Sequence, residues 1–300
     1  MTRGFLTVAT GNLIYSKMAY YLLMSFRRFN AHHYPFAVIT DKANNWLNTF
    51  DIVIELPNCN YNFLDKLLCF VHAPFDETIF IDSDSLVYKD LDSLFNYFKD
   101  ADDISCVGNC FERESDKGWL IYENTLQFKD KIKYNVWLHG GIYFIRKSER
   151  AELFYQTCMS IVPYYKRIFT QYKYLTEPAD EPIVALAMAI VGYKPIYYYP
   201  EILAFYRDSK ISYIDILTGS LRYTVSTGST NAGCIIHFAT QNTKKAVYQN
   251  EIKKLEWSIH NSRKQPSALL KAYWKTNLLL GKQIDRFKER LNYNYIESGK

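Results

Sequence analysis

The sequence predicts an α/β fold in which short apolar strands alternate with helices. The chain has 300 residues, of which 48% are hydrophobic, and this is enough for one large core or for one domain of about 240 residues with an appendage. The first apolar β-type run, residues 5–10, leads into residues 15–29, where apolar side chains recur at helical spacing. Strands and helices that alternate in this way favour a parallel sheet with right-handed crossovers.

The rest of the chain continues this alternation. A helix is expected at residues 63–71, just before the strand at 78–81, which would be about the fourth strand in order. The other expected strands are at 36–40, 52–54, 104–108, 137–145 (with a Gly-Gly turn) and 233–238, and the other expected helices begin near residue 149 and cover 183–191, 244–260 and 267–292.

Two aspartates end the fourth strand. Asp82 and Asp84 directly follow the apolar run 78–81, and open α/β sheets bind their ligands at the carboxyl ends of strands. Paired carboxylates suit Mg²⁺ or Mn²⁺, which fill their remaining positions with water and substrate phosphates. An Asp-x-Asp triplet alone more often marks a solvated turn or a helix N-cap, but this one follows a strand. The sequence therefore predicts a metal-dependent enzyme with a phosphorylated substrate.

Three further features have both a functional and a plain structural interpretation. Asp180 and Glu181 precede a helical run, so helix capping and the helix dipole explain them without any function. His237 stands alone in an apolar run, where a core position is more common than a metal ligand. Gly140 and Gly141 permit close approach of a ligand to the backbone, and a simple turn explains them equally well.

Three segments together resemble nucleotide-sugar-dependent glycosyltransferases of the GT-A fold: residues 9–11, 80–87 and 235–238. The closest likeness is to the glycogenin-like family 8 enzymes, which have an aspartate pair on a strand, an asn-x-gly turn, an acidic box before a helix and a late ile-his motif. The resemblance spans most of residues 5–240. It implies an α/β fold built on a GT-A Rossmann-like mixed sheet flanked by helices, with a C-terminal helical tail.

Carried over residue by residue, the resemblance implies that Asp82, Asp84 and His237 hold Mn²⁺ or Mg²⁺. It implies that Asp180 and Glu181 are the catalytic residues and face the transferred sugar and the acceptor. It implies that the donor, expected to be linked to UDP, contacts Thr10, Tyr15, Lys66, Asp82, Ser83, Gly140 and Gly141.

The implied reaction moves a sugar from a nucleotide-sugar to a saccharide, lipid or protein acceptor. An inverting enzyme needs a carboxylate to take the acceptor proton, whereas front-side retaining transfer leaves that proton to the departing phosphate. Asp180 or Glu181 could serve either scheme, and the likeness to family 8 favours retention. A histidine ligand such as His237 slightly favours Mn²⁺ over Mg²⁺.

The sequence also departs from the family pattern. His139 stands where the family has asparagine, the acidic box reads Asp-Glu-Pro, and the residues after His237 lack the usual family motif. Two alternatives stay open: a non-catalytic nucleotide-sugar or glycan-binding protein of the same fold, and a haloacid-dehalogenase-type phosphatase. The phosphatase motif wants Thr or Val where this chain has Leu86.

The cysteines and the start of the chain indicate where in the cell the protein is expected. The six cysteines show no metal-type pairing and are expected to be reduced. The start of the chain has no signal-peptide pattern and no apolar stretch is long enough to cross a bilayer, so a cytoplasmic location is the expectation.

The basic residues of the chain are concentrated in its C-terminal part. Residues 241–300, which we expect to form a basic helical extension of a catalytic domain at 1–240, contain thirteen Lys or Arg and five Asp or Glu, a net charge of +8. The net charge of the whole chain is +5, which leaves −3 for residues 1–240. A basic amphipathic helix can lie on an anionic membrane surface, here the inner membrane face. Packing of this helix against the catalytic domain, or the formation of a homodimer, explains the same pattern. No known nucleic-acid-binding motif accompanies the basic residues, so nucleic acid is not expected as a partner.

Overall fold

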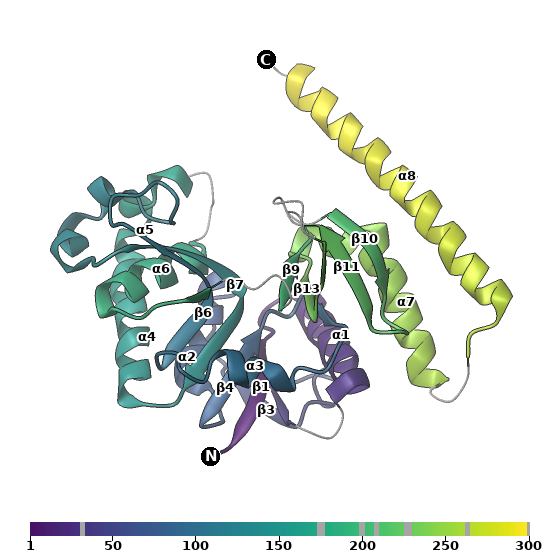
Figure 1. The fold of residues 1–300 in the computed structure, drawn as a ribbon, viewed down its shortest axis with the longest axis horizontal. Helices are drawn as coiled ribbons and strands as arrows, with labels where there is room; N and C mark the ends of the chain where they lie inside the picture. The colour runs from purple at the N-terminus through teal and green to yellow at the C-terminus, as the bar shows by residue number, and fades with distance from the viewer. Residues whose placement is uncertain are drawn as a thin grey trace.

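The computed structural model describes residues 1–30, 34–172, 178–197, 202–206, 210–224, 230–261 and 265–298. A seven-stranded mixed sheet runs through the molecule in the order β3-β2-β1-β4-β7-β6-β8, with helices on both faces (Figure 1). The predicted α/β fold, a Rossmann-like mixed sheet flanked by helices with a C-terminal helix, is confirmed.

Four neighbouring strands of this sheet are parallel, as the alternation of strands and helices predicts. They are β3 (Ile52–Glu55), β2 (Phe36–Thr40), β1 (Arg3–Val8) and β4 (Glu77–Ile81). Side chains alternate between the two faces, so that Phe5 and Ile79 join one core cluster while Leu6 and Phe80 join the other. Burial on both faces explains why β2 and β4 read as continuous apolar runs.

The other half of the sheet contains a long strand with a bulge. Strand β7 (Asn135–Arg146) runs antiparallel between β4 and β6 (Ile104–Phe111), and β8 (Ile196–Tyr197) pairs with β6. The register with β6 shifts from Tyr143 to His139, so Gly140 and Gly141 lie in a β-bulge. The predicted Gly-Gly turn before a strand is therefore wrong, because both glycines lie inside β7.

Two three-stranded sheets complete the β-structure. One contains β5 (Ser85–Val87), β13 (Ile235–His237) and β9 (Leu203–Phe205), and the other contains β10 (Lys210–Asp215), β11 (Ser220–Thr224) and β12 (Thr230–Ala232). Strand β13 pairs antiparallel with β5, with His237 opposite Ser85. This pairing brings the C-terminal part of the chain to the end of β4.

The helices cover the sheet in two groups. One face carries the 3-10 helix η1 (Phe63–Leu68), α2 (Cys69–His72), α4 (Glu149–Ile161), α5 (Tyr165–Ile168) and α6 (Asp180–Val191). The other face carries α1 (Leu13–Asn30) and α3 (Asp92–Tyr97). The helix expected at 63–71 is thus a 3-10 helix that continues into one short α-helix.

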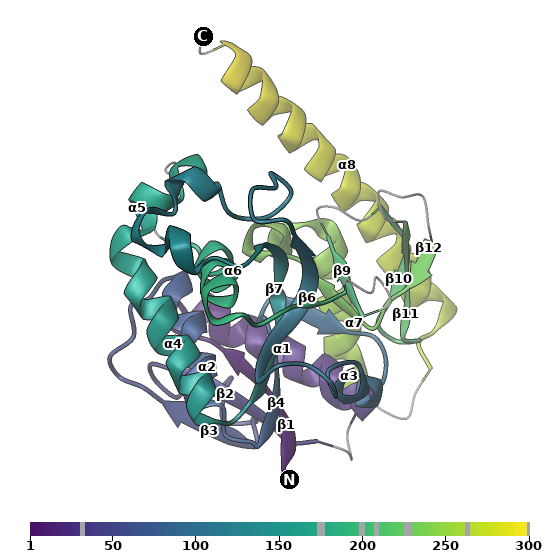
Figure 2. The same cartoon turned by 60° about the vertical axis from the view of Figure 1, so that its left-hand side comes forward.

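The chain ends in two antiparallel helices, α7 (Ala246–His260) and α8 (Ala268–Ser298). Helix α7 buries Val247, Ile252 and Leu255 in a third core cluster, which also contains residues of β10 and β11. Figure 2 shows the C-terminal end of α8 projecting beyond the rest of the molecule. Among the described residues, no helix is both long enough and apolar enough to cross a lipid bilayer.

Candidate active site

A buried turn joins β4 to β5 and holds the predicted aspartates. Asp82 donates its backbone N–H to the carbonyl of Gly141 at 3.0 Å, and Ser85 donates its own to the carbonyl of Asp82 at 3.1 Å. Ser83 and Asp84 are only 4% and 5% exposed, so this is not the solvated turn that a short acidic triplet usually marks.

Three potential metal ligands meet at this turn. Nε2 of His237 lies 2.9 Å from Oδ1 of Asp84 and 3.4 Å from Oδ2 of Asp82, and one ligand atom from each residue lies within 4.8 Å of the others. Two carboxylates and an imidazole that converge in this way are ligands suited to a divalent cation such as Mn²⁺.

The charges of these groups depend on one another. Burial and the charge of Asp84 raise the pKa of Asp82, against the opposing effect of Lys66. Burial also acts to raise the pKa of Asp84, but the nearby His237 outweighs it and holds this pKa below its ordinary value. Burial acts to lower the pKa of His237, yet Asp84 and Asp82 raise it overall. The two carboxylates therefore stabilise positive charge on the neighbouring His237 ring.

Lys66 supplies a fixed positive charge beside the cluster. It belongs to η1, whose first turn is capped by the side chain of Asn62. Its Nζ lies 2.9 Å from Oδ2 of Asp82 and 3.2 Å from Oδ2 of Asp180. Burial acts to lower the pKa of Lys66, but the charges of Asp180 and Asp82 outweigh it and hold the pKa well above its ordinary value.

The two predicted catalytic carboxylates open α6 and face the site. The N-cap residue is Ala179 without a side-chain capping bond, so capping does not account for them. Tyr143 donates its hydroxyl to Asp180 at 2.9 Å, and Gly140 donates its N–H to Glu181 at 2.8 Å. Burial and the charge of Asp180 raise the pKa of Glu181 to about 7. Glu181 can therefore gain or lose a proton near neutral pH.

Gly140 and Gly141 are required because side chains from α6 and β13 approach their backbone closely. A Cβ on Gly140 would lie 2.7 Å from Cγ of Glu181, and a Cβ on Gly141 would lie 2.9 Å from Nδ1 of His237. A Cβ at either position would force the side chain of Glu181 or the ring of His237 to shift. The bulge thus lets three elements converge.

His139 also lines the site and was not predicted. Its Nδ1 accepts the N–H of Gly141 at 3.1 Å, while its Nε2 is buried without a hydrogen bond to any described residue. Burial and the nearby His237 hold the pKa of His139 well below its ordinary value, so the ring is neutral at pH 7. The sequence signals for this residue are weak: it stands just before two glycines in an apolar strand, at the position where the family pattern has asparagine.

The two residues predicted beside the nucleoside lie in different places. Thr10 follows β1 and donates its hydroxyl to Asp65, the neighbour of Lys66, at 2.8 Å. Tyr15 is on α1 and packs, partly buried, against the core cluster of that sheet face. Thr10 is therefore hydrogen-bonded to η1, beside Lys66, whereas Tyr15 packs against the core.

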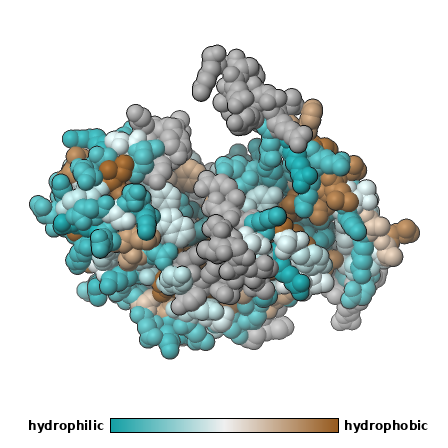
Figure 3. All heavy atoms as spheres, turned by 45° about the horizontal axis from the view of Figure 1, so that its top comes forward, coloured by the Kyte–Doolittle hydropathy of each residue, from teal (hydrophilic) through white to brown (hydrophobic). Residues whose placement is uncertain are grey.

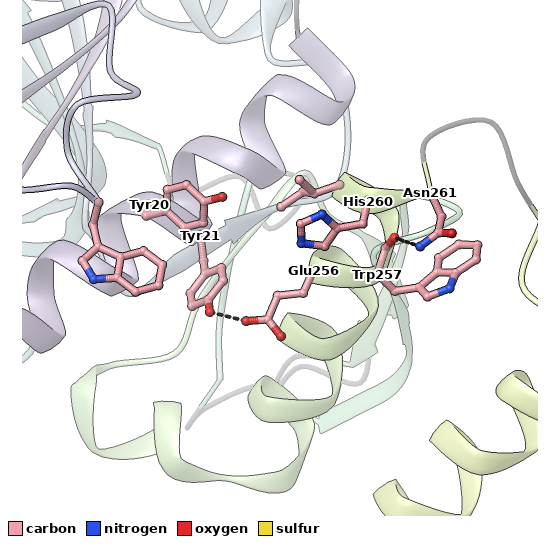
Figure 4. A pocket seen from close by; sticks show the side chains of 8 residues that line it. Tyr20, Tyr21, Glu256, Trp257, His260 and Asn261 are labelled. Atoms are coloured by element: carbon pink, nitrogen blue, oxygen red, sulfur yellow. Dashed lines mark hydrogen bonds between the residues drawn. The ribbon is translucent and has the colours of Figure 1, made fainter.

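A cavity of about 430 Å³ lies elsewhere, between α1, the loop at Trp46 and the end of α7. Figure 4 shows the hydroxyl of Tyr21 donating a hydrogen bond to Glu256 across it, with Tyr20 and His260 near by. The lining of this cavity includes none of the predicted site residues. It is a feature of the packing of α1 on α7.

Comparison with protein-family models gives no match, and comparison with curated proteins gives no relative.

Proposed function

We propose that the chain is a metal-dependent glycosyltransferase that moves a sugar from a nucleotide-sugar, a UDP-sugar, to a saccharide, lipid or protein acceptor. The observation that carries this proposal is the convergence of Asp82, Asp84 and His237 at the carboxyl end of β4. The resemblance to GT-A enzymes of family 8 supplies the donor class. We also propose a cytoplasmic location, because the cysteines are free thiols.

Charge at the leaving group is the main chemical demand of this reaction. Breaking the bond between the anomeric carbon and a phosphate oxygen leaves negative charge on the nucleoside diphosphate. A divalent cation held by the Asp82–Asp84–His237 cluster would neutralise that charge as it develops. Lys66, fixed 2.9 Å from Asp82, adds a second positive charge within the same site.

The two carboxylates of α6, Asp180 and Glu181, would have different roles in the reaction. In an inverting scheme Glu181, with a pKa of about 7, would take the proton of the acceptor hydroxyl. Asp180 is held by Lys66 and Tyr143, so its carboxylate is positioned to stabilise positive charge that develops on the sugar. Retention is proposed from the family resemblance alone, and in a retaining scheme Glu181 would orient the acceptor.

Release of free nucleotide tests the proposal. We would incubate the full chain with UDP-glucose, UDP-galactose, UDP-N-acetylglucosamine and the corresponding GDP-sugars, with Mn²⁺ or with EDTA. The proposal expects release of UDP from at least one donor in Mn²⁺ and none in EDTA. Binding of UDP without release from any donor would favour the non-catalytic binding protein. If UDP is neither bound by the protein nor released from any donor, the proposal is contradicted.

A further inference from the structure

Helix α8 has one face that is fixed to the body of the protein. The Trp274 ring lies 5.8 Å from that of Trp257 on α7, and Leu278 packs against the third core cluster. Further along, a Cβ on Gly281 would lie 2.5 Å from Cβ of Ala246. This face is therefore occupied by the chain itself.

A second face of α8 is apolar and exposed. Its members, 53–83% exposed, are Leu269, Tyr273, Leu280, Ile284 and Phe287. At about 100° per residue they fall within about 60° of one another, and their centre lies about 130° from the face that packs on the body. Leu279, 56% exposed, widens the sector. We call these six residues the outer stripe.

Basic residues border the outer stripe. Helix α8 contains six Lys or Arg residues and three acidic ones. Two of the acidic residues are turned to the body, since Asp285 accepts the N–H of Ala246 at 2.8 Å and Glu289 lies 2.6 Å from Nζ of Lys245. On the helical wheel Arg286 lies about 20° beyond Leu279 on one side of the stripe, and Lys288 lies about 40° beyond Ile284 on the other. Lys275 and Lys282 lie further round the helix, nearer the face that packs on the body.

The views of the whole molecule fit a helix that is free to meet a surface. Figures 1 and 2 both show α8 at the edge of the molecule, with its last turns beyond every other element. In Figure 3, hydrophobic (brown) and hydrophilic (teal) side chains lie side by side on the right-hand part of the surface. An apolar sector with basic borders is thus displayed on an outlying helix.

We propose that α8 binds the surface of an anionic lipid bilayer through the outer stripe. The apolar side chains would enter the boundary between headgroups and acyl chains, and the bordering lysines and arginines would contact the lipid phosphates. A second copy of the chain fits less well, because it would bring two strongly basic helices together. The helix is about 46 Å long and would lie along the surface rather than cross it.

Sedimentation of the full chain with vesicles tests this proposal and requires no donor or acceptor, so its outcome is independent of the transferase proposal. Vesicles of phosphatidylcholine alone would be compared with vesicles that also contain phosphatidylglycerol. The variant is Ile284→Glu in the outer stripe (Ile284 is 54% exposed), and the matched control is Leu153→Glu on α4, where Leu153 is 55% exposed.

Binding of the unchanged protein is expected with phosphatidylglycerol and should weaken at high salt. Ile284→Glu should lower the partition by about tenfold or more, and Leu153→Glu should leave it unchanged. Arg286→Gln, which removes one bordering charge, should lower it by about fivefold. Equal melting temperatures would show that the variants are folded.

Three results would overturn the proposal. The first is failure of the unchanged protein to bind phosphatidylglycerol vesicles. The second is an equal loss of binding in Leu153→Glu and Ile284→Glu. The third is a dimer in light scattering that Ile284→Glu dissociates, without vesicle binding, which would assign the outer stripe to a second copy.

Discussion

Two buried groups of charged residues in this protein have opposite properties. One fixes α7 to the body and consists of Tyr88, Asp215, Glu251 and Lys254; we call it the α7 anchor. Glu251 is fully buried and accepts the N–H of Ile216 at 2.6 Å and the hydroxyl of Tyr88 at 3.2 Å. Lys254 lies 2.7 Å from Glu251 and 3.0 Å from Asp215. Each charge here has its partner.

In the carboxylate site at the end of β4, by contrast, some buried polar atoms have no partner. Nδ1 of His237 and Nε2 of His139 are buried without a hydrogen bond to any described residue. An unpaired buried polar atom costs about 1–3 kcal/mol, a cost that a ligand would remove on binding. The comparison teaches that unsatisfied capacity, more than buried charge, separates a candidate binding site from a structural ion-pair network.

The largest effect is expected from a change in the carboxylate site. Asp84→Asn keeps the shape of the side chain but removes one metal-ligand charge, so turnover of the UDP-sugar should fall by about a thousandfold. Asp100→Asn is the control, since the side chain of Asp100 is 88% exposed, and it should keep full activity. Turnover of Asp84→Asn within tenfold of the unchanged protein would contradict the assignment of this residue.

The α7 anchor should respond in stability instead. Lys254→Met leaves Glu251 buried without its cation and should lower the free energy of unfolding by about 3–5 kcal/mol, as measured by urea denaturation. The neighbouring exposed residue gives the matched control, Lys253→Met, which should change it by less than about 0.5 kcal/mol. Turnover per folded molecule should persist in both. Equal stability of the two variants would remove the distinction between the anchor and the surface.

The protonation of Glu181 links stability to pH. Its pKa is raised to about 7 in the fold, above its value in the unfolded chain, so the folded state retains a proton that the unfolded state has lost. The stabilisation is complete at low pH and disappears as pH rises through about 7, by up to about 3 kcal/mol. Glu181→Gln should remove this pH dependence when unfolding is measured in EDTA.

The control for this pH effect is Glu152→Gln on α4, where Glu152 is exposed. It should retain the pH dependence of the unchanged protein. The same slope in Glu181→Gln and in the control would show that Glu181 titrates at its ordinary pKa.

The smallest change concerns space rather than charge. Gly140→Ala would place a Cβ 2.7 Å from Cγ of Glu181, and the adjustment should cost about 1–3 kcal/mol of stability. Because the displaced group is Glu181, turnover should fall as well. Thermal melting and UDP release, measured on the same preparation, test both effects. Unchanged turnover would mean that the position of Glu181 does not matter to the reaction.

Much of the framework could be predicted because its signals are local. The apolar run before Asp82 has the length and continuity of a strand buried on both faces, and the structure has β4 there. Residues 15–29 carry a helical repeat, and α1 covers them. The terminal helix follows from the same kind of pattern. The alternation of strands and helices predicted a parallel sheet, however, and only the family resemblance implied the mixed sheet that the antiparallel strand β7 creates.

The remaining parts of the site depend on contacts between distant segments. Local preference assigns Asp180 to a helix cap, whereas the fold pairs it with Lys66, more than a hundred residues earlier. Alternation along β7 cannot reveal a bulge, so Gly140 was expected in a turn. His139 carries only a weak sequence signal, because its place in the site depends on the contact between its ring and that of His237 on β13, whose centroids are 5.3 Å apart.

A thermal-shift measurement with UDP, with and without Mn²⁺, on the unchanged protein and on Asp84→Asn tests the central claim most directly. A ligand at about a hundred times its dissociation constant adds about 2.7 kcal/mol of stability, which raises the melting temperature visibly. We predict an increase that requires UDP, Mn²⁺ and Asp84 together. No increase with UDP and Mn²⁺, or an equal increase in Asp84→Asn, would contradict a nucleotide-sugar site at the end of β4.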